Sequence, residues 1–244
     1  REAGAVLRGA PNFRDIGGHR SRDGRTVRHD RVFRSGHLGA LEPEDIQLLR
    51  ARLGRDVCVV DLRGSRERLA APCSLPGATV HSLPVEPTVA RKLDALAATG
   101  QPLTGLAAER FMREAYEGFV RHAVPAIGAL FGHLLADPQR PVVLHCTAGK
   151  DRTGFCAAML LSALEVPRDA VMDDYLHTNQ RIEPRLEGRF PPEILRVLAR
   201  VRPEFLNAAF GAIGSAHGDV DGFLRQAVGL PTAGLDRLRE RLLV

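Results

Sequence analysis

The sequence contains no tryptophan and only two tyrosines among its 244 residues. Proteins that bind single-stranded nucleic acid stack its bases on aromatic side chains, and few such side chains are available here. Lys and Arg outnumber Asp and Glu by 34 to 29, for a net charge of +5, but the basic residues are scattered rather than grouped. These features argue against nucleic-acid binding, and the positive excess suits an acidic or phosphorylated ligand.

Long hydrophobic runs are also missing. No apolar run approaches the roughly 18 residues that a membrane-spanning helix needs, and the longest, 155–164, is interrupted by Ser162. We therefore predict no stable membrane span. The numbering begins at Arg1 rather than Met, so we expect an upstream segment to have been trimmed or left out. A secretory signal is one alternative for that segment, which leaves the localisation open between cytoplasmic and secreted.

Cysteine is scarce, with four residues that suggest neither a disulfide framework nor a metal site. There is no Cys-x-x-Cys pair and no Cys/His spacing typical of zinc sites, so no metal and no cofactor is expected. Cys58 and Cys156 lie in apolar runs and are expected in the core. Cys73 is expected to be an incidental surface thiol. Cys146 differs from these three because of its neighbours.

Hydrophobic periodicity predicts an α/β fold. Residues 10–31 are expected to be rich in loops, and 84–105 have no clear pattern and are a candidate flap over a site. Short apolar runs predict strands at 32–34, 56–62, 79–83 and 141–145. Helical spacing covers 43–53, 109–122, 124–136, 155–164, 168–178, 191–200, 203–213, 219–228 and 232–243. We predict one domain over 1–244, with a small, mostly parallel central sheet flanked by helices and a helical C-terminal part over 168–244.

A cysteine and an arginine separated by five residues follow the strand predicted at 141–145. The segment 145–154 reads HCTAGKDRTG, and a helix is predicted after it. This order places the loop at the carboxyl end of a strand, where open α/β sheets bind ligands. Inward-turned backbone N–H groups that end at a helix N-terminus stabilise a thiolate, and they also bind the oxygens of a phosphate group. The loop is therefore predicted to prepare both a nucleophile and its substrate.

The residue types in this loop suit phosphoryl transfer. Cys146 is the predicted nucleophile, which would form a phosphocysteine intermediate, and Arg152 offers a planar fork for two phosphate oxygens. Thr153 is placed to donate a hydrogen bond to the departing sulfur, and His145 to orient the loop. Gly149 permits a tight turn close to the ligand. The predicted substrate-binding residues are His145, Thr147, Ala148, Gly149, Lys150 and Thr153.

This segment resembles the phosphate-binding loop of the protein tyrosine phosphatase superfamily. More narrowly, it is similar to that of the bacterial tyrosine phosphatases with dual lipid and protein activity, which carry Lys-Asp before the arginine. The segments NFRDIGG (12–18), DLR (61–63) and DDYL (173–176) agree with that group. The resemblance implies the fold of those phosphatases, no metal cofactor, and Cys146 and Arg152 in the roles above. It also implies phosphotyrosine as the first substrate class, with phosphoserine, phosphothreonine or phosphoinositides as alternatives.

The general acid that protonates the leaving oxygen is open between two aspartates and some other residue. Ordinary tyrosine phosphatases carry it on a mobile Trp-Pro-Asp loop, which a sequence without tryptophan cannot contain. Asp151 is the first candidate, and Asp61, at a predicted strand end, is the second. For each of them the alternative is an ion pair with a nearby arginine. Lys150 is expected to be a second cation for the phosphate; the alternatives are a solvated side chain or an ion pair with Asp151.

The remaining expectations concern the surroundings and the partners of the loop. Arg14, Asp15 and Arg34 are expected to brace it. A nucleotide-binding Walker loop is excluded, because Leu144 stands where it needs Gly and Asp151 where it needs Ser or Thr. The expected partners are a phosphorylated protein or phospholipid substrate and inorganic phosphate at the loop. The alternative function is a phosphate-binding or scaffold module without catalysis.

Overall fold

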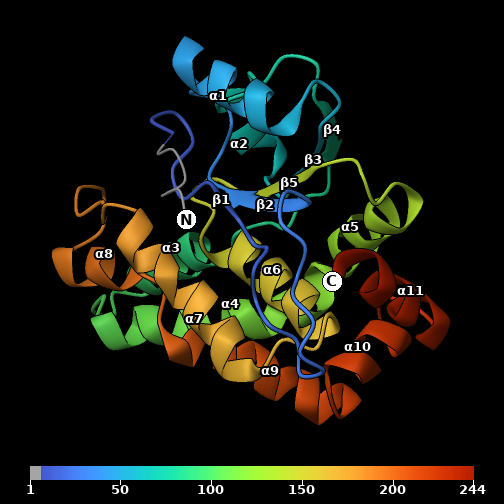
Figure 1. The fold of residues 1–244 in the computed structure, drawn as a ribbon. Helices are drawn as coiled ribbons and strands as arrows, with labels where there is room; N and C mark the ends of the chain where they lie inside the picture. The colour runs from blue at the N-terminus through green and yellow to red at the C-terminus, as the bar shows by residue number, and fades with distance from the viewer. Residues whose placement is uncertain (1–6) are drawn as a thin grey trace.

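The protein was analysed as a computed structural model that describes residues 7–244. A five-stranded sheet lies between helices (Figure 1). Its strands are β1 (Arg14–Asp15), β2 (Val32–Ser35), β3 (Cys58–Asp61), β4 (Thr79–Ser82) and β5 (Val142–His145). Their order is β1-β2-β5-β3-β4, in which β1 is antiparallel to β2 and the other pairs are parallel. The predicted α/β fold with a mostly parallel sheet is confirmed.

The register of the sheet brings the carboxyl ends of three strands to the same end of the sheet. His145, the last residue of β5, is paired with Ser35 of β2 on one side and Asp61 of β3 on the other. Since parallel strands point in the same direction, the segments that follow all three strands start at this end of the sheet. The loop that begins at Cys146 therefore lies at the carboxyl end of the central strand, between the segments that follow β2 and β3.

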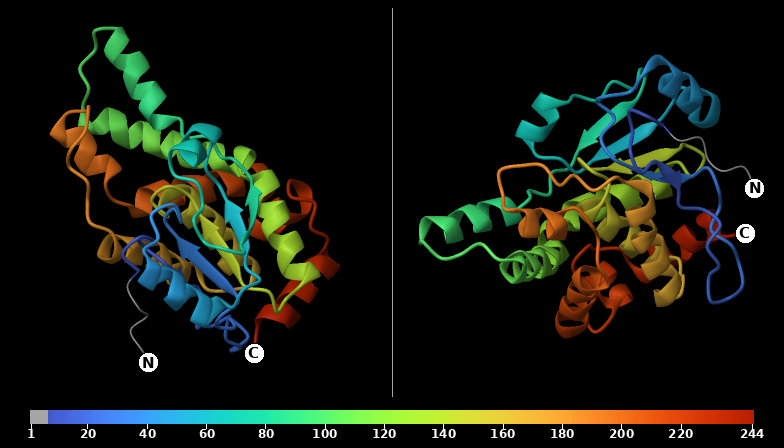
Figure 2. Two further views of the ribbon diagram at one scale, coloured as in Figure 1. Left: turned by 90° about the horizontal axis from the view of Figure 1, so that it is seen from above. Right: turned by 90° about the vertical axis from the view of Figure 1, so that its left-hand side faces the viewer.

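Helices cover both faces of the sheet, with most of them on one side (Figures 1 and 2). The described residues form α1 (Pro43–Leu53), α2 (Ser65–Ala70), α3 (Val89–Ala98), α4 (Gly105–His122), α5 (Val124–Ala136), α6 (Asp151–Ala163), α7 (Arg168–Arg181), α8 (Pro192–Leu198), α9 (Pro203–His217), α10 (Val220–Gln226) and α11 (Thr232–Leu242). α1 and α2 lie above the sheet in Figure 1, and α4 to α11 lie below it. The helical C-terminal part is confirmed.

Successive strand residues point to opposite faces of the sheet, and both faces are covered by apolar side chains. On one face, Phe33, Val59 and Val143 pack with Leu49 and Leu53 of α1. On the other face, a larger cluster joins the sheet to α4–α11; its strand members are Val32, Cys58, Val60, Val142 and Leu144. Burial on both sides explains why the central strands β3 and β5 read as continuous apolar runs rather than as alternating patterns.

The cysteine positions largely follow expectation. Cys58 and Cys156 are buried in the larger cluster, as predicted. Cys73 is half-buried and packs against the smaller cluster, so its assignment as a surface thiol was wrong.

Several boundaries differ from the sequence patterns. α2 was not predicted, because six residues are too few to show a helical period. α3 occupies part of the unassigned segment 84–105 and buries Leu93. α4 begins at Gly105 rather than 109, since the hydroxyl of Thr104 accepts a hydrogen bond from the Ala107 amide and caps the helix. α7 continues to Arg181 instead of ending at 178.

The segment 10–31 is loop-rich, as expected, and it is tied to the end of the chain. Backbone hydrogen bonds of 2.7 and 2.9 Å join Thr26 and Val244 in both directions. The last helices thereby connect to the sheet through the N-terminal segment as well as through the core. Within residues 7–244 no single helix is long and apolar enough to cross a membrane, although α4 and α5 pass that test together as a pair bent by 55°.

Candidate active site

The loop between β5 and α6 carries Cys146 at its start. Cys146 is buried, whereas the next residue, Thr147, is exposed, so the loop reaches the surface. Burial alone would raise the pKa of the Cys146 thiol. The charge of Arg152 and the nearby backbone amides of Thr153 and Lys150 outweigh it, and the pKa is lowered. The loop therefore favours a thiolate, which is the nucleophilic form of cysteine.

Gly149 allows the loop to pass directly over the end of β2. Its φ of +67° lies in the left-handed region that favours glycine. A Cβ at this position would lie 2.3 Å from the carbonyl carbon and oxygen of Ser35. Both the backbone angle and the close approach thus require glycine.

Arg152, in the first turn of α6, is held by a carboxylate that the sequence analysis did not identify. Its two terminal nitrogens donate to Glu67 Oε1 and Oε2 at 2.7 and 2.8 Å, and one of them also lies 3.3 and 3.2 Å from the carbonyl oxygens of Leu62 and Val85. Burial opposes the charge of Arg152, but the Glu67 hydrogen bonds and the charges of Cys146 and Glu67 raise its pKa. This two-point contact fixes the plane of the guanidinium.

Glu67 is itself held in place from several sides. It accepts hydrogen bonds from the backbone amide of Gly64, at 2.9 Å, and from the hydroxyl of Thr147. Burial alone would raise its pKa, but the contacts with Arg152, Thr147 and Gly64 lower it to about 2. The signal in the sequence was a glutamate shortly after Asp-Leu-Arg, at the third position of a helix too short to be recognised.

Asp151, the first residue of α6, receives two hydrogen bonds. The hydroxyl of Tyr116 donates to Oδ1 at 2.8 Å, and the ammonium of Lys150 donates to Oδ2 at 2.6 Å. The Asp151 side chain is one-quarter exposed. Lys150 therefore forms the ion pair with Asp151, which was one of the alternatives considered for it.

Tyr116 belongs to a buried hydrogen-bonded chain of hydroxyls. Its oxygen lies 2.8 Å from that of Tyr175, and these are the two tyrosines of the whole sequence. Burial and the charge of Asp151 raise the pKa of both phenols, so both remain protonated hydroxyls. No local pattern in the sequence connects either tyrosine with the site.

Asp61, the second acid candidate, is occupied by an arginine. It is 1% exposed, and Arg63 donates to its two oxygens from Nε and a terminal nitrogen at 3.0 and 2.8 Å. Burial would raise the pKa of Asp61, but the hydrogen bonds from Arg63 lower it. This geometry is the ion-pair alternative considered for Asp61.

His145 is fully buried at the end of β5. Its Nδ1 lies 3.0 Å from the carbonyl oxygen of Cys146, and its Nε2 lies 3.7 Å from Asp61. Burial lowers the pKa of the imidazole, so the neutral ring donates from Nδ1 to the loop backbone. Of the predicted binding residues, Ala148 is half-buried within the loop, and Thr147 directs its hydroxyl to Glu67.

The far side of the loop is braced by arginines from the sheet, as expected for Arg14 and Arg34. Arg34 donates to the carbonyl oxygen of Gly149 at 3.0 Å and to Asp174 of α7 at 2.9 Å. Arg14 donates to the backbone of Asp174 at 2.8 Å, and Asn12 donates to Gly149 at 2.8 Å. Asp174 is thus the counter-charge of two buried cations.

Asp15, in contrast, does not brace the loop. Its carboxylate accepts hydrogen bonds from the amides of Gly17 and Asp30 at 2.7 and 2.8 Å and from Arg52 at 3.2 Å. It stabilises the N-terminal segment against α1, because β1 is two residues long and successive side chains of a strand point to opposite sides. The expectation for Asp15 was wrong.

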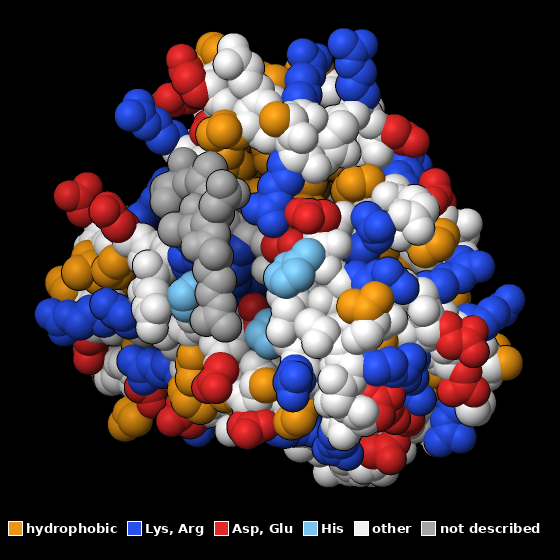
Figure 3. Space-filling model, viewed as in Figure 1, with side chains coloured by type: hydrophobic (Ala, Val, Ile, Leu, Met, Phe, Trp, Pro, Cys, Tyr) orange, Lys and Arg blue, Asp and Glu red, His pale blue; other side chains and the backbone are white. Residues whose placement is uncertain are grey.

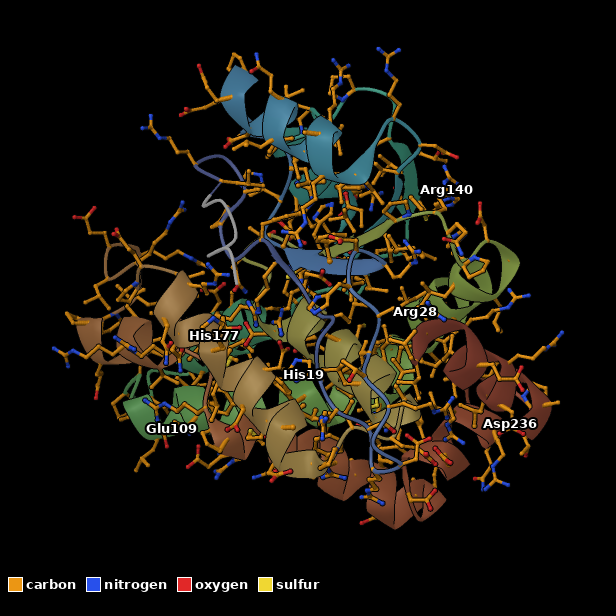
Figure 4. All side chains as sticks on the ribbon, in the orientation of Figure 1. His19, Arg28, Glu109, Arg140, His177 and Asp236 are labelled. Atoms are coloured by element: carbon orange, nitrogen blue, oxygen red, sulfur yellow. The ribbon has the colours of Figure 1, made fainter. Side chains whose placement is uncertain are left out.

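A polar cavity of about 470 Å³ lies beside this brace. Arg14 and Asp174 line it together with His19 and His177, which are labelled in Figure 4 and come from the N-terminal segment and α7. The corresponding face of the molecule carries several histidine and basic side chains (Figure 3).

With this geometry established, the chain was compared with known proteins. Residues 5–244 match the profile of the tyrosine phosphatase family. The chain belongs to this family. A Cupriavidus necator protein named "Putative tyrosine-protein phosphatase" is 35% identical over 236 residues, which cover 92% of this chain and 84% of that protein. The "Triple specificity protein phosphatase PtpB" of Mycobacterium tuberculosis is 32% identical over 279 residues, which cover 97% and 98% of the two chains.

A third relative matches over a short stretch. A "Tyrosine-protein phosphatase" of Nostoc commune is 39% identical over 62 residues, 25% of this chain and 21% of its own length. The family membership predicted from HCTAGKDRTG is confirmed, and the chain is a hydrolase of the protein tyrosine phosphatase kind. The roles of individual residues stay predictions.

Proposed function

We propose that this phosphatase hydrolyses phosphate monoesters, phosphotyrosine foremost, through a phosphocysteine intermediate on Cys146. The observation that carries the proposal is a buried thiol with a lowered pKa, followed in the same loop by Arg152, whose fork is fixed by Glu67. In the first step, the thiolate attacks phosphorus and the bond to the ester oxygen breaks. Arg152 stabilises the charge on the phosphoryl oxygens during this transfer.

Asp151 is the proposed general acid. In the first step its proton passes to the leaving oxygen. In the second, a water molecule attacks phosphorus, the sulfur–phosphorus bond breaks, and Asp151 takes the proton of the water. The partial exposure of Asp151 and its place in the loop support this role. Both oxygens of Asp61 are engaged by Arg63, so Asp61 is better suited to orienting Arg63 at the strand end.

The test of the nucleophile is hydrolysis of an aryl phosphate by the wild-type protein and by Cys146→Ser. We expect turnover to be lost in the variant while inorganic phosphate still binds, because the backbone N–H groups and Arg152 remain. Unchanged turnover would remove the proposed mechanism. Absence of turnover in both proteins, with phosphate binding retained, would favour the alternative of a phosphate-binding module without catalysis.

The test of the acid is Asp151→Asn with substrates of different leaving groups. An alkyl oxygen needs protonation more than a good aryl leaving group does, so we expect a loss of about 100-fold or more on alkyl phosphates and a smaller loss on activated aryl phosphates. Equal losses on both would assign Asp151 a structural role. The Mycobacterium tuberculosis relative is named a triple specificity phosphatase, which supports a substrate panel wider than phosphotyrosine. The panel therefore includes phosphoserine, phosphothreonine and phosphoinositide substrates.

A further inference from the structure

Three potential metal ligands meet where β3 and β4 pack against α5, on the opposite side of β5 from β2 in the sheet. They are Cys58 at the start of β3, His81 on β4 and His133 in the last turn of α5. The sulfur and one nitrogen from each ring all lie within 4.8 Å of one another. Because Cys58 is paired with Thr79 and Val60 with His81, the side chains of Cys58 and His81 lie on the same face of the sheet.

The two rings are close and incompletely bonded. The centroids of His81 and His133 are 4.1 Å apart with the planes tilted by 44°. Nε2 of His81 is buried and has no hydrogen-bond partner among residues 7–244. A buried polar atom without a partner is costly, and an ion bound at this position would remove that cost. This orphaned nitrogen is a second observation, independent of the clustering, that points to a ligand.

The nearest cation does not prevent metal binding. Arg140, labelled in Figure 4, lies where the chain passes from α5 to β5. Its terminal nitrogen donates to Asp56 and to the Thr79 hydroxyl, each at 2.7 Å. The charge of Arg140 is therefore paired by the Asp56 carboxylate.

We propose that Cys58, His81 and His133 form a binding site for a divalent transition-metal ion of the zinc class. One thiolate and two imidazoles suit zinc, and they do not suit magnesium or calcium, which prefer oxygen ligands. In a tetrahedral zinc site, neighbouring ligand atoms are about 3.5 Å apart, so side-chain movements of about 1 Å convert the observed cluster into a coordination shell. His81 and His133 are partly exposed, which leaves the fourth position to water.

The position indicates a structural role for this site. Cys58 is three residues before Asp61, so it lies about 10 Å along β3 from the end of the sheet where the Cys146 loop begins. β4 is an edge strand whose residues are mostly exposed. A metal that joins β3, β4 and α5 would hold the outer strand β4 against the helical layer. Three ligands from three separate elements also explain why no local Cys/His spacing indicated the site.

The test is a cobalt titration of the full chain. Cys146→Ser serves as the background, because it removes the reactive thiol of the phosphate-binding loop as a competing ligand. After treatment with a chelator, we expect one equivalent of Co²⁺ to produce a near-ultraviolet thiolate charge-transfer band and the visible bands of tetrahedral cobalt. Adding Cys58→Ser should abolish the charge-transfer band, and adding His81→Ala or His133→Ala should weaken binding at least about tenfold.

Two control variants outside the cluster and a measurement of thermal stability complete the test. Cys73→Ser and His122→Ala change a half-buried thiol and an exposed imidazole outside the cluster, and should leave the spectrum unchanged. Zn²⁺ should raise the Tm of the background protein but not that of a variant with His133→Gln, whose partial exposure makes misfolding a small risk. The proposal is overturned if Co²⁺ gives no tetrahedral bands, if the charge-transfer band persists without Cys58, or if Zn²⁺ leaves the Tm unchanged.

Discussion

At the scale of single residues, each charged group around the phosphate-binding loop has a specific partner. Arg152 is held by Glu67, Asp61 by Arg63, and Asp151 by Lys150. Fixed partners of this kind orient the groups before a substrate arrives, so little reorganisation is needed during the reaction. Substitutions in this set are therefore expected to alter activity in ways that depend on the lost partner.

Gly149→Ala should be far more damaging than substitution of another glycine with positive φ. Gly24 has φ of +88° but open space around its Cα, whereas a Cβ on Gly149 would collide with the backbone of Ser35. We expect Gly24→Ala to lower the free energy of unfolding by about 1 kcal/mol and Gly149→Ala by more than about 2 kcal/mol, with loss of phosphatase activity. Urea unfolding followed by circular dichroism measures this, and equal effects would contradict the collision.

Glu67 should contribute to stability above mildly acidic pH. Its pKa is lowered from an ordinary 4.5 to about 2 in the folded state, so its stabilising effect is complete above about pH 4.5 and is lost as the pH falls toward 2. Glu67→Gln should therefore be less stable than wild type near neutral pH, and the difference should shrink across this window. Urea midpoints of both proteins from pH 6 to pH 2 measure it; a difference that is constant with pH would contradict the ion pair.

At the scale of elements, the site depends on helices that meet only in three dimensions. α4 contributes Tyr116, α7 contributes Tyr175 and Asp174, and α2 contributes Glu67. The hydroxyls of Tyr175 and Tyr116 and the carboxylate of Asp151 in α6 form one hydrogen-bonded chain. The orientation of Asp151 is thus set by two helices that are distant from the loop in sequence.

Tyr116→Phe should impair the acid step selectively. The variant removes the hydrogen bond to Asp151 Oδ1, and we expect kcat on alkyl phosphates to fall about tenfold, with KM and activated aryl substrates little affected. Tyr175→Phe is the matched control, because it leaves the Tyr116–Asp151 contact in place and should have a smaller effect. A uniform fall on all substrates would indicate a packing defect instead.

Asp174→Asn should destabilise the attachment of α7 to the sheet. Asp174 is the counter-charge of the buried Arg14 and Arg34, and removing one partner leaves cations uncompensated. We expect a loss of about 3 kcal/mol in the free energy of unfolding, whereas Asp173→Asn, at the exposed neighbouring position, should change it by less than about 0.5 kcal/mol. Similar values for the two variants would contradict the proposed brace.

At the scale of the whole molecule, we predict a single domain over 1–244, and such a domain should unfold in one cooperative transition. One apolar cluster runs from Ile16 near the start of the described residues to Leu243, and it joins the sheet to the helices after Arg168. Calorimetry should show a single peak with equal calorimetric and van't Hoff enthalpies. Two resolved transitions, or independent folding of 168–244, would contradict this prediction.

Strong local patterns allowed most of the fold to be predicted. The strands at 32–35, 79–82 and 142–145 and the helix Pro43–Leu53 agree closely with the structure, because apolar spacing, Pro43 and Gly54 define them locally. α2 was too short for such a pattern, and α3 lay in a segment whose periodicity was obscured by its Pro- and Ala-rich surroundings. Boundaries of α4 and α7 depended on a cap and on tertiary contacts.

The sequence by itself determined the family, and it predicted the loop from Cys146 to Arg152 as the phosphate site and Cys146 as the nucleophile, because these depend on contiguous residues whose spacing carries the chemistry. Tertiary structure alone decided which groups complete the site. Glu67 meets Arg152, Tyr116 meets Asp151, and Asp61 is occupied by Arg63 because the register of parallel strands and the packing of helices bring together residues far apart in the chain. The cluster of Cys58, His81 and His133 has the same origin. No local pattern encodes a pair of residues that only folding makes neighbours.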